Sequence, residues 1–389
     1  MSPSDAGDSP ENGDSSGHNV IPTDQYIVLT NGEREPGLWL RRFALASVVA
    51  TFALIVLGGI VRVTGSGLGC GGEWPLCDGS LIPPLTKEDI IEYSHRLVAS
   101  GIVGPLVAGT FLIALFRHRH ERAVLIPSGI SVVLLLVQAG LGGVTVLTEL
   151  PGHVVAAHMA LAQALLGCLI LVAVASYNAR VTVLVPSPAA ASPVSASAST
   201  IYEESPASDS TPEGQGRFPL LAAIAAVATY ALILSGSYVT ATPGALAACS
   251  QWPLCDGSIL PSGGLQAIHM LHRLVAAVVG IFLIYTLYRG YKLGIQRMAE
   301  GGIPLMFLSA GGIVVFLTQV FIGALAIWTS FPVAIRAYHI GLATAIWGII
   351  VAVSLLSLAR GPGNQVVLRG ANPVPGPGTY PPRKNPIDQ

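Results

Sequence analysis

Five of the nine histidines fall inside apolar stretches, at His95, His158, His269, His272 and His339. An ionisable side chain at membrane depth is costly and marks a functional site by default. All but His269 lie at a similar depth, within the first turn or two of their apolar stretch, at ~1.5 Å per helical residue. The other histidines lie in polar tails and loops, where we interpret them as solvated: His18, His118, His120 and His153.

The four histidines at matching depth form two pairs, His95 with His158 and His272 with His339. Two facing imidazoles in the core of a helical bundle form an axial pair for a haem iron. Zinc would require a third or fourth nitrogen or sulfur ligand, and the sequence offers none at that level. The alternative is a polar contact between helices, which accounts for one histidine more readily than for four in a repeat.

Charged residues accompany each pair. Arg96 and Arg273 directly follow a histidine and are candidates to contact haem propionates, although interfacial arginines also snorkel without a ligand. Glu92 precedes His95 by three residues and therefore shares its helix face. The aligned residue in the second half is His269, which would bond a propionate or tune the ligand. This difference predicts chemistry on the haem of the first half and electron transfer through the haem of the second.

A repeated loop accompanies the repeated histidines. CGGEWPLCDGS (70–80) and CSQWPLCDGS (249–258) share seven residues, WPLCDGS, at an offset of 178 positions. Gln138 and Gln319 continue the repeat. Each loop has two cysteines on the side of the membrane that we expect to be oxidising, which favours local disulfides over free thiols or metal ligands. The pairs are Cys70–Cys77 and Cys249–Cys255.

The elements that position these residues are apolar runs long enough for a bilayer, which needs about 20 residues each. They lie near 42–62, 93–116, 124–147, 155–177, 219–241, 267–288, 303–328 and 335–359. Hydrophobic residues make up 52% of the chain and charged residues 11%, against about 25% charged in soluble domains. We therefore predict an all-α integral membrane protein with eight transmembrane helices. The net charge of −1 gives no electrostatic case for nucleic acid.

The repeat and the basic residues predict the topology. Four spans separate the two loops, so both halves enter the membrane in the same direction, as two parallel-repeat four-helix bundles. Fifteen Lys and Arg residues lie on one side of the spans and three on the other, which places both termini in the cytoplasm. The predicted parts are a disordered tail (1–40), an N-terminal bundle (41–177), a Ser/Pro/Ala-rich linker (178–218), a C-terminal bundle (219–359) and a second disordered tail (360–389).

Together these motifs resemble the haem A synthase family. The resemblance rests on GGIVRVTGSGLGC with WPLCDGSLIPP, IEYSHRLVAS, the His158 helix, HMLHRLVA and AYHIGLATAIW. It covers roughly residues 40–359; the long linker departs from the family pattern. It implies an oxidoreductase of the bacterial plasma membrane that oxidises the ring D methyl group of haem O to a formyl group. The product, haem A, serves cytochrome oxidase.

The resemblance also assigns roles to single residues. Glu92 matches the catalytic carboxylate, and His95 and His158 match the pair flanking the substrate haem. His272 and His339 match the pair that ligates a resident haem b. The expected partners are haem O, a haem O synthase, cytochrome oxidase assembly factors and, as a further candidate, a second copy of the chain.

Two rival functions use the same features. A dihaem b-type electron-transfer cytochrome would also use paired histidines, but it would normally place its haems at opposite membrane faces. It would also not need Glu92 in one half alone. A haem or lipid transporter fits the repeat, but an axial histidine pair binds too tightly for easy passage. The pigments bound by the purified protein distinguish these functions.

Overall fold

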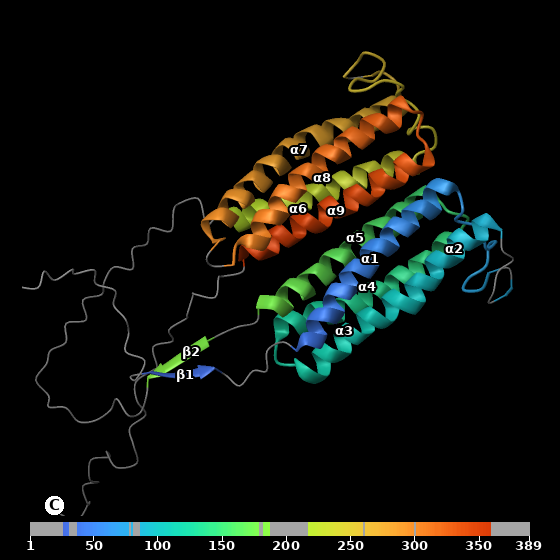
Figure 1. Ribbon diagram of the computed structural model, residues 1–389. Coiled ribbons are helices and arrows are strands. Elements are labelled where there is room, and N and C mark those ends of the chain that lie inside the picture. The colour runs from blue at the N-terminus through green and yellow to red at the C-terminus, as the bar shows by residue number, and fades with distance from the viewer. Residues whose placement is uncertain are drawn as a thin grey trace, which may run out of the picture. The chain divides into compact units, whose positions relative to one another are not determined.

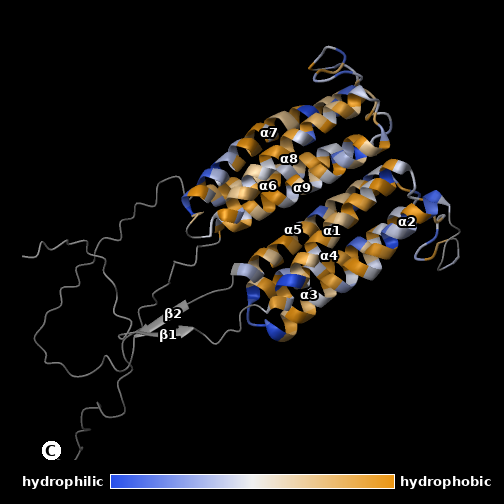
Figure 2. Cartoon of the chain, viewed as in Figure 1, coloured by the Kyte–Doolittle hydropathy of each residue, from blue (hydrophilic) through white to orange (hydrophobic). Residues whose placement is uncertain are grey.

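The computed structural model describes residues 26–30, 37–77, 79–80, 86–178, 182–186, 217–259, 261–298 and 301–358. These residues include eight helical segments long and apolar enough to cross a membrane. Figure 2 shows the predominance of hydrophobic residues along them. The chain is therefore a multi-pass membrane protein of the predicted all-α class, and each predicted span corresponds to one segment.

The first four spans contain six helical elements. Their bounds are α1 (Leu38–Thr64), α2 (Lys87–Val98), η2 (Ala99–Val103), α3 (Gly104–Arg117), α4 (Arg122–Leu147) and α5 (Gly152–Asn178). Gly65 ends α1 in the left-handed region, at φ 75°, where glycine has no Cβ penalty. Thr86 and Asp89 begin α2 with reciprocal side-chain-to-backbone hydrogen bonds.

The second span is continuous from Lys87 to Arg117 but contains the π-helical segment η2. The N–H of Gly104 bonds to the carbonyl of Ala99, one residue further back than in an α-helix. Pro105 follows and has no N–H to donate, so the regular bond pattern is already interrupted here. The aligned residue of the second half is Phe282, and helix α7 is continuous there.

The last four spans are single helices. Their bounds are α6 (Phe218–Ala241), α7 (Gly264–Gln296), α8 (Ile303–Trp328) and α9 (Val333–Leu358). In Figure 1 these helices form one group, and α1 to α5 form another. Within each group, successive spans contact each other and the first contacts the last: α1 meets α5, and α6 meets α9. This matched pattern supports the parallel repeat, which stays a prediction.

The two groups contact each other through α1, α5, α6 and α9. At their centre, Nε2 of Gln163 donates to the hydroxyl of Thr344 at 2.9 Å. The indole of Trp347 donates to the carbonyl of Gln163, also at 2.9 Å. Gln163 and Thr344 are each 1% exposed and lie 181 positions apart, at equivalent places in the repeat. A buried polar contact therefore joins the halves.

The chain has a second, smaller unit besides the helical one. Its described part is a pair of antiparallel strands, β1 (Tyr26–Thr30) and β2 (Thr182–Pro186), with Tyr26 opposite Pro186. The sequence did not predict this pairing. The predicted tail and linker also overlap the helices, because α1 begins at Leu38, α5 ends at Asn178 and α6 begins at Phe218. Apart from these residues, Gly37, Arg217 and the two strands, the predicted tails and linker lie outside the described residues.

Candidate functional site

Each of the four paired histidines packs against a glycine of a neighbouring helix. A Cβ added at that glycine would lie 2.9–3.2 Å from the imidazole Cε1. The contacts are Gly58 of α1 with His95 of α2, Gly142 of α4 with His158 of α5, Gly236 of α6 with His272 of α7, and Gly323 of α8 with His339 of α9. Any larger residue would push the ring away, so these glycines fix where the imidazoles lie.

The histidines of each half lie close together. His95 and His158 are within range of a direct charge interaction, and so are His272 and His339. Among the described residues, no group of three or more His, Cys, Asp or Glu side chains could hold a metal ion. Two imidazoles held from different helices, without a third ligand, fit the axial ligation of a haem iron and not a zinc site.

His272 also has a hydrogen-bond partner on its ring. The hydroxyl of Ser235 lies 2.8 Å from Nδ1 of His272 and donates to the carbonyl of Leu232 at 2.7 Å. In the tautomer that carries its proton on Nδ1, the ring donates to this hydroxyl, and Nε2 keeps the lone pair that a metal requires. Leu57 occupies the aligned position in the first half. Nδ1 of His95 is buried and has no hydrogen-bond partner in the described part of the chain.

Glu92 is buried, with 4% of the residue exposed, and both of its oxygens have partners. One oxygen pairs with the guanidinium of Arg96, and the other accepts the backbone N–H of Cys70 at 2.9 Å. The carboxylate thus joins the helix of His95 to the disulfide loop. This linking role could not be predicted, because it depends on the folded course of the loop.

Arg96 and Arg273 hold the two WPLC loops in the same way. Arg96 Nη1 donates to the carbonyl of Leu76 at 2.8 Å and to those of Glu73 and Pro75. Arg273 makes the equivalent bonds to the carbonyls of Gln251, Pro253 and Leu254, at 2.7–3.2 Å. Besides these loop carbonyls, Arg96 contacts Glu92 and Arg273 contacts His269. Contact with haem propionates stays a prediction.

His269 takes the place of Glu92 in the second half. It is 5% exposed, and its Nε2 lies 3.4 Å from Nη2 of Arg273. Its ring also lies near that of Phe331, with 6.4 Å between the centroids. The second half therefore has an imidazole, which is never negatively charged in this setting, where the first half has a carboxylate.

Both WPLC loops are closed by a disulfide, Cys70–Cys77 and Cys249–Cys255. Each loop reaches across the bundle by its tryptophan. Trp74 lies against Gly143 of α4, and Trp252 stacks edge-on with Trp328 of α8, with 5.8 Å between the centroids. The loop of each half therefore connects the helix of the first histidine, α2 or α7, with the helix that packs against the second, α4 or α8.

Sequence reasoning missed Ser235 and the four glycines. The glycines had a signal, since Gly58 and Gly236 lie 178 positions apart and Gly142 and Gly323 lie 181 apart, as the repeat requires. The solvated state predicted for His118 is wrong. This residue is 5% exposed, and its Nδ1 pairs with Glu121 at 2.7 Å, which fixes the turn between α3 and α4.

Comparison with known proteins gives the chain a family. The sequence profile described as cytochrome oxidase assembly protein matches residues 41–351. A haem A synthase of Alkalihalophilus pseudofirmus is 30% identical over 263 residues, which cover 65% of this chain and 80% of the relative. Haem A synthases of Geobacillus kaustophilus and Symbiobacterium thermophilum are each 28% identical, covering 82–83% of this chain and 92–96% of the relatives. The chain belongs to the cytochrome oxidase assembly protein family.

Proposed function

We propose that the protein is a haem A synthase, which oxidises the ring D methyl group of haem O to a formyl group by successive hydroxylations. The observation that carries this proposal is the duplicated pair of glycine-backed histidines, with a buried carboxylate in one copy only. The names of the relatives support the same activity. The product would be used to assemble cytochrome oxidase.

The second half is the proposed site of a resident haem b, held by His272 and His339. Ser235 supports this assignment because it favours the tautomer of His272 with a free lone pair on Nε2. Gly236 and Gly323 hold the two rings in place from the opposite helices. When bound, the haem supplies a centre that accepts and passes on electrons.

The first half is the proposed site of the substrate, haem O, between His95 and His158. Neither ring has a serine like Ser235 beside it in this half: the aligned residue is Leu57. A less constrained ligand suits a molecule that must leave after oxidation, because binding must be reversible.

Glu92 is the proposed catalytic carboxylate of the first half. It lies one helical turn before His95, and its oxygens are held by Arg96 and by the N–H of Cys70. A buried carboxylate held in this way can oppose positive charge that develops on the substrate or accept a proton from it. In the second half His269 cannot supply that negative charge, so the proposal confines the chemistry to the first half.

We also propose a cellular location and partners for the protein. The protein would lie in the bacterial plasma membrane with both termini in the cytoplasm and the disulfide loops outside. It would receive haem O from a haem O synthase and act with cytochrome oxidase assembly factors. Reporter fusions test the orientation. A reporter that works only in the cytoplasm is inserted between Cys70 and Lys87, and activity of this fusion would contradict the orientation.

The test of the activity is haem extraction from a host that lacks haem A but makes haem O. Expression of this chain should produce haem A, whereas the host with an empty vector should contain haem O and haem B. The dihaem b-type cytochrome is the alternative. Haem B alone in the purified protein, with no haem A in the cells, would favour that function and refute the synthase.

A further inference from the structure

Helices α1 and α9 form a close seam between the two halves. A Cβ on Gly59 would meet the side chain of Ile340 at 2.9 Å, and one on Gly341 would meet Val56 at 3.6 Å. The helices therefore approach each other closely on the side of the membrane where the disulfide loops lie.

Two arginines lie at the loop-side end of this seam, one turn beyond the contact. Arg62 of α1 and Arg336 of α9 are both partly exposed and near enough for their charges to interact. Arg62 donates to the carbonyl of Thr240 at 3.4 Å. In the part of the chain that the structure describes, neither arginine has an acidic partner within 4.0 Å. Two guanidinium groups without an acidic partner can both donate hydrogen bonds to one phosphate.

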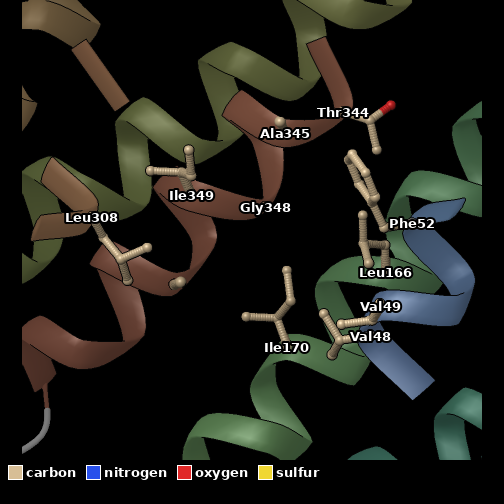
Figure 3. Close-up of a pocket in the computed structure, with 11 residues that line it drawn as sticks. Val48, Val49, Phe52, Leu166, Ile170, Leu308, Thr344, Ala345, Gly348 and Ile349 are labelled. Carbon is tan, nitrogen blue, oxygen red and sulfur yellow. The ribbon is translucent and has the colours of Figure 1, made fainter. Parts of the chain in front are cut away.

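An apolar groove lies on the other side of the contact, toward the middle of the membrane. It has a volume of about 290 Å³, and Figure 3 shows the side chains that line it. Its lining runs from Phe52 and Thr344, near the middle of the membrane, to Val48, Ala352 and Leu308, on the side away from the arginines. Phe52 precedes Arg62 by ten residues, which corresponds to ~15 Å along a helix. One leaflet of a bilayer core is about as deep, since the whole core is ~30 Å thick.

The equivalent seam between α5 and α6 has different residues at both places. The residues aligned with Arg62 and Arg336 are Thr240 and Val155. Where the groove would be, the rings of Tyr230 and Trp347 pack together with 5.2 Å between their centroids, and Trp347 lies against Gly167. Among the described residues, the two cations therefore occur on one seam, and aromatic rings occupy the place equivalent to the groove on the other.

We propose that the α1–α9 seam binds an anionic phospholipid from the leaflet on the side of the disulfide loops. Its phosphate accepts hydrogen bonds from Arg62 and Arg336, and the end of one acyl chain enters the groove at Phe52 and Ala345. Charge complementarity identifies the headgroup, and the apolar lining of the groove suits the end of the chain. The bound lipid covers the joint between the halves and leaves both histidine pairs free.

The test compares lipids retained by the full-length protein after extraction from the membrane in mild detergent. The protein is relipidated with equal amounts of phosphatidylglycerol and phosphatidylcholine, washed, and its bound lipids are measured by mass spectrometry. One variant combines Arg62→Gln with Arg336→Gln. A second, Gly348→Leu, fills the groove, where an added Cβ would meet Ile170 at an ordinary contact distance of 3.5 Å. Gel filtration checks that each variant is folded.

The wild type should retain phosphatidylglycerol in preference to phosphatidylcholine, and inorganic phosphate should not displace it. Both variants should lose about tenfold or more of the retained phosphatidylglycerol, because charge-assisted bonds or chain contacts are removed. Lys87→Gln, which removes a loop-side cation away from the seam, and Gly311→Leu, at a glycine with open space beside it, are the controls and should behave as the wild type. Unchanged retention in either seam variant would overturn the proposal. Displacement by inorganic phosphate would also overturn it and would indicate a simple anion site.

Discussion

Ser235 gives Nδ1 of His272 a hydrogen-bond partner at 2.8 Å, which orients the ring and favours the tautomer with a free Nε2. The aligned Leu57 can do neither for His95. A hydrogen bond to the far nitrogen of a metal-ligating imidazole also raises its basicity. The difference between Ser235 and Leu57 agrees with a retained cofactor in the second half and an exchangeable substrate in the first.

Replacing Ser235 by Ala should weaken haem b binding, by about 10–100-fold if it behaves as other outer partners of metal-ligating histidines do. The loss should show as a lower haem B content and as a shifted midpoint potential of the haem that remains. Ser237→Ala, two residues further along α6, is the matched control. Equal haem content and potential in both variants would mean that Ser235 only packs.

Glu92→Gln keeps the shape of the side chain but removes the charge that faces Arg96. Haem A formation should fall about 10²–10⁴-fold, the usual size of an acid–base contribution. The protein should keep its haem b and accumulate haem O or a partly oxidised product, measured by extraction and chromatography. Glu88→Gln, exposed on the same helix, should keep normal activity. A normal yield of haem A from Glu92→Gln would show that the carboxylate is structural.

The paired histidines, the disulfide loops and Glu92 could be found in the sequence because residue type and repeat spacing identify them. The partners of Arg96 and Arg273 could not be. An arginine beside a buried histidine suits a propionate and a loop carbonyl equally well until the loop's course is known. Ser235 was hidden for a related reason: its role depends on the helix phase that brings it to His272.

At the level of helices, four glycines set the distance between each histidine and the helix opposite. Other glycines of the same helices, which contact no histidine, serve as controls. Gly140 precedes Gly142 in α4, and Gly311 precedes Gly323 in α8, and both have open space where a Cβ would be added. The contact with the imidazole is therefore separable from the general effect of replacing glycine in a helix.

Gly323→Ala should move the ring of His339, because the new Cβ would lie 3.0 Å from its Cε1. Overpacking of this kind costs about 1–3 kcal/mol and here would appear as altered low-spin haem g-values or lost haem B. Gly142→Ala should disturb substrate binding at His158 in the same way. Gly311→Ala and Gly140→Ala should change neither. Spectra of Gly323→Ala identical to the wild type would contradict the positioning role.

The membrane spans were predictable because long apolar runs have few alternatives in a bilayer. The π-helical segment η2 was not predicted. Pro105 marks the place, but a proline within a span can also kink a regular helix or follow a short break. The outcome depends on how α1 and α4 pack around it.

At the scale of the whole molecule, the contact of Gln163 with Thr344 joins the halves at their repeat-equivalent centre. Thr344→Val keeps the shape but leaves the amide of Gln163 without its acceptor in a buried place, which costs about 1–3 kcal/mol. The apparent Tm in detergent should fall. Thr318→Val, whose hydroxyl bonds only within α8 at 2.9 Å, is the control. An equal Tm for the two variants would mean that the contact does not hold the halves together.

The central claim is that the two histidine pairs bind different haems, and haem extraction from purified variants tests it most directly. The protein is co-expressed with a haem O synthase, and its pigments are separated by chromatography. His272→Ala should lose haem B and keep haem O, whereas His95→Ala should lose haem O and haem A and keep haem B. Haem B in both sites of the wild type, lost by half in each variant, would contradict the account and identify a dihaem cytochrome.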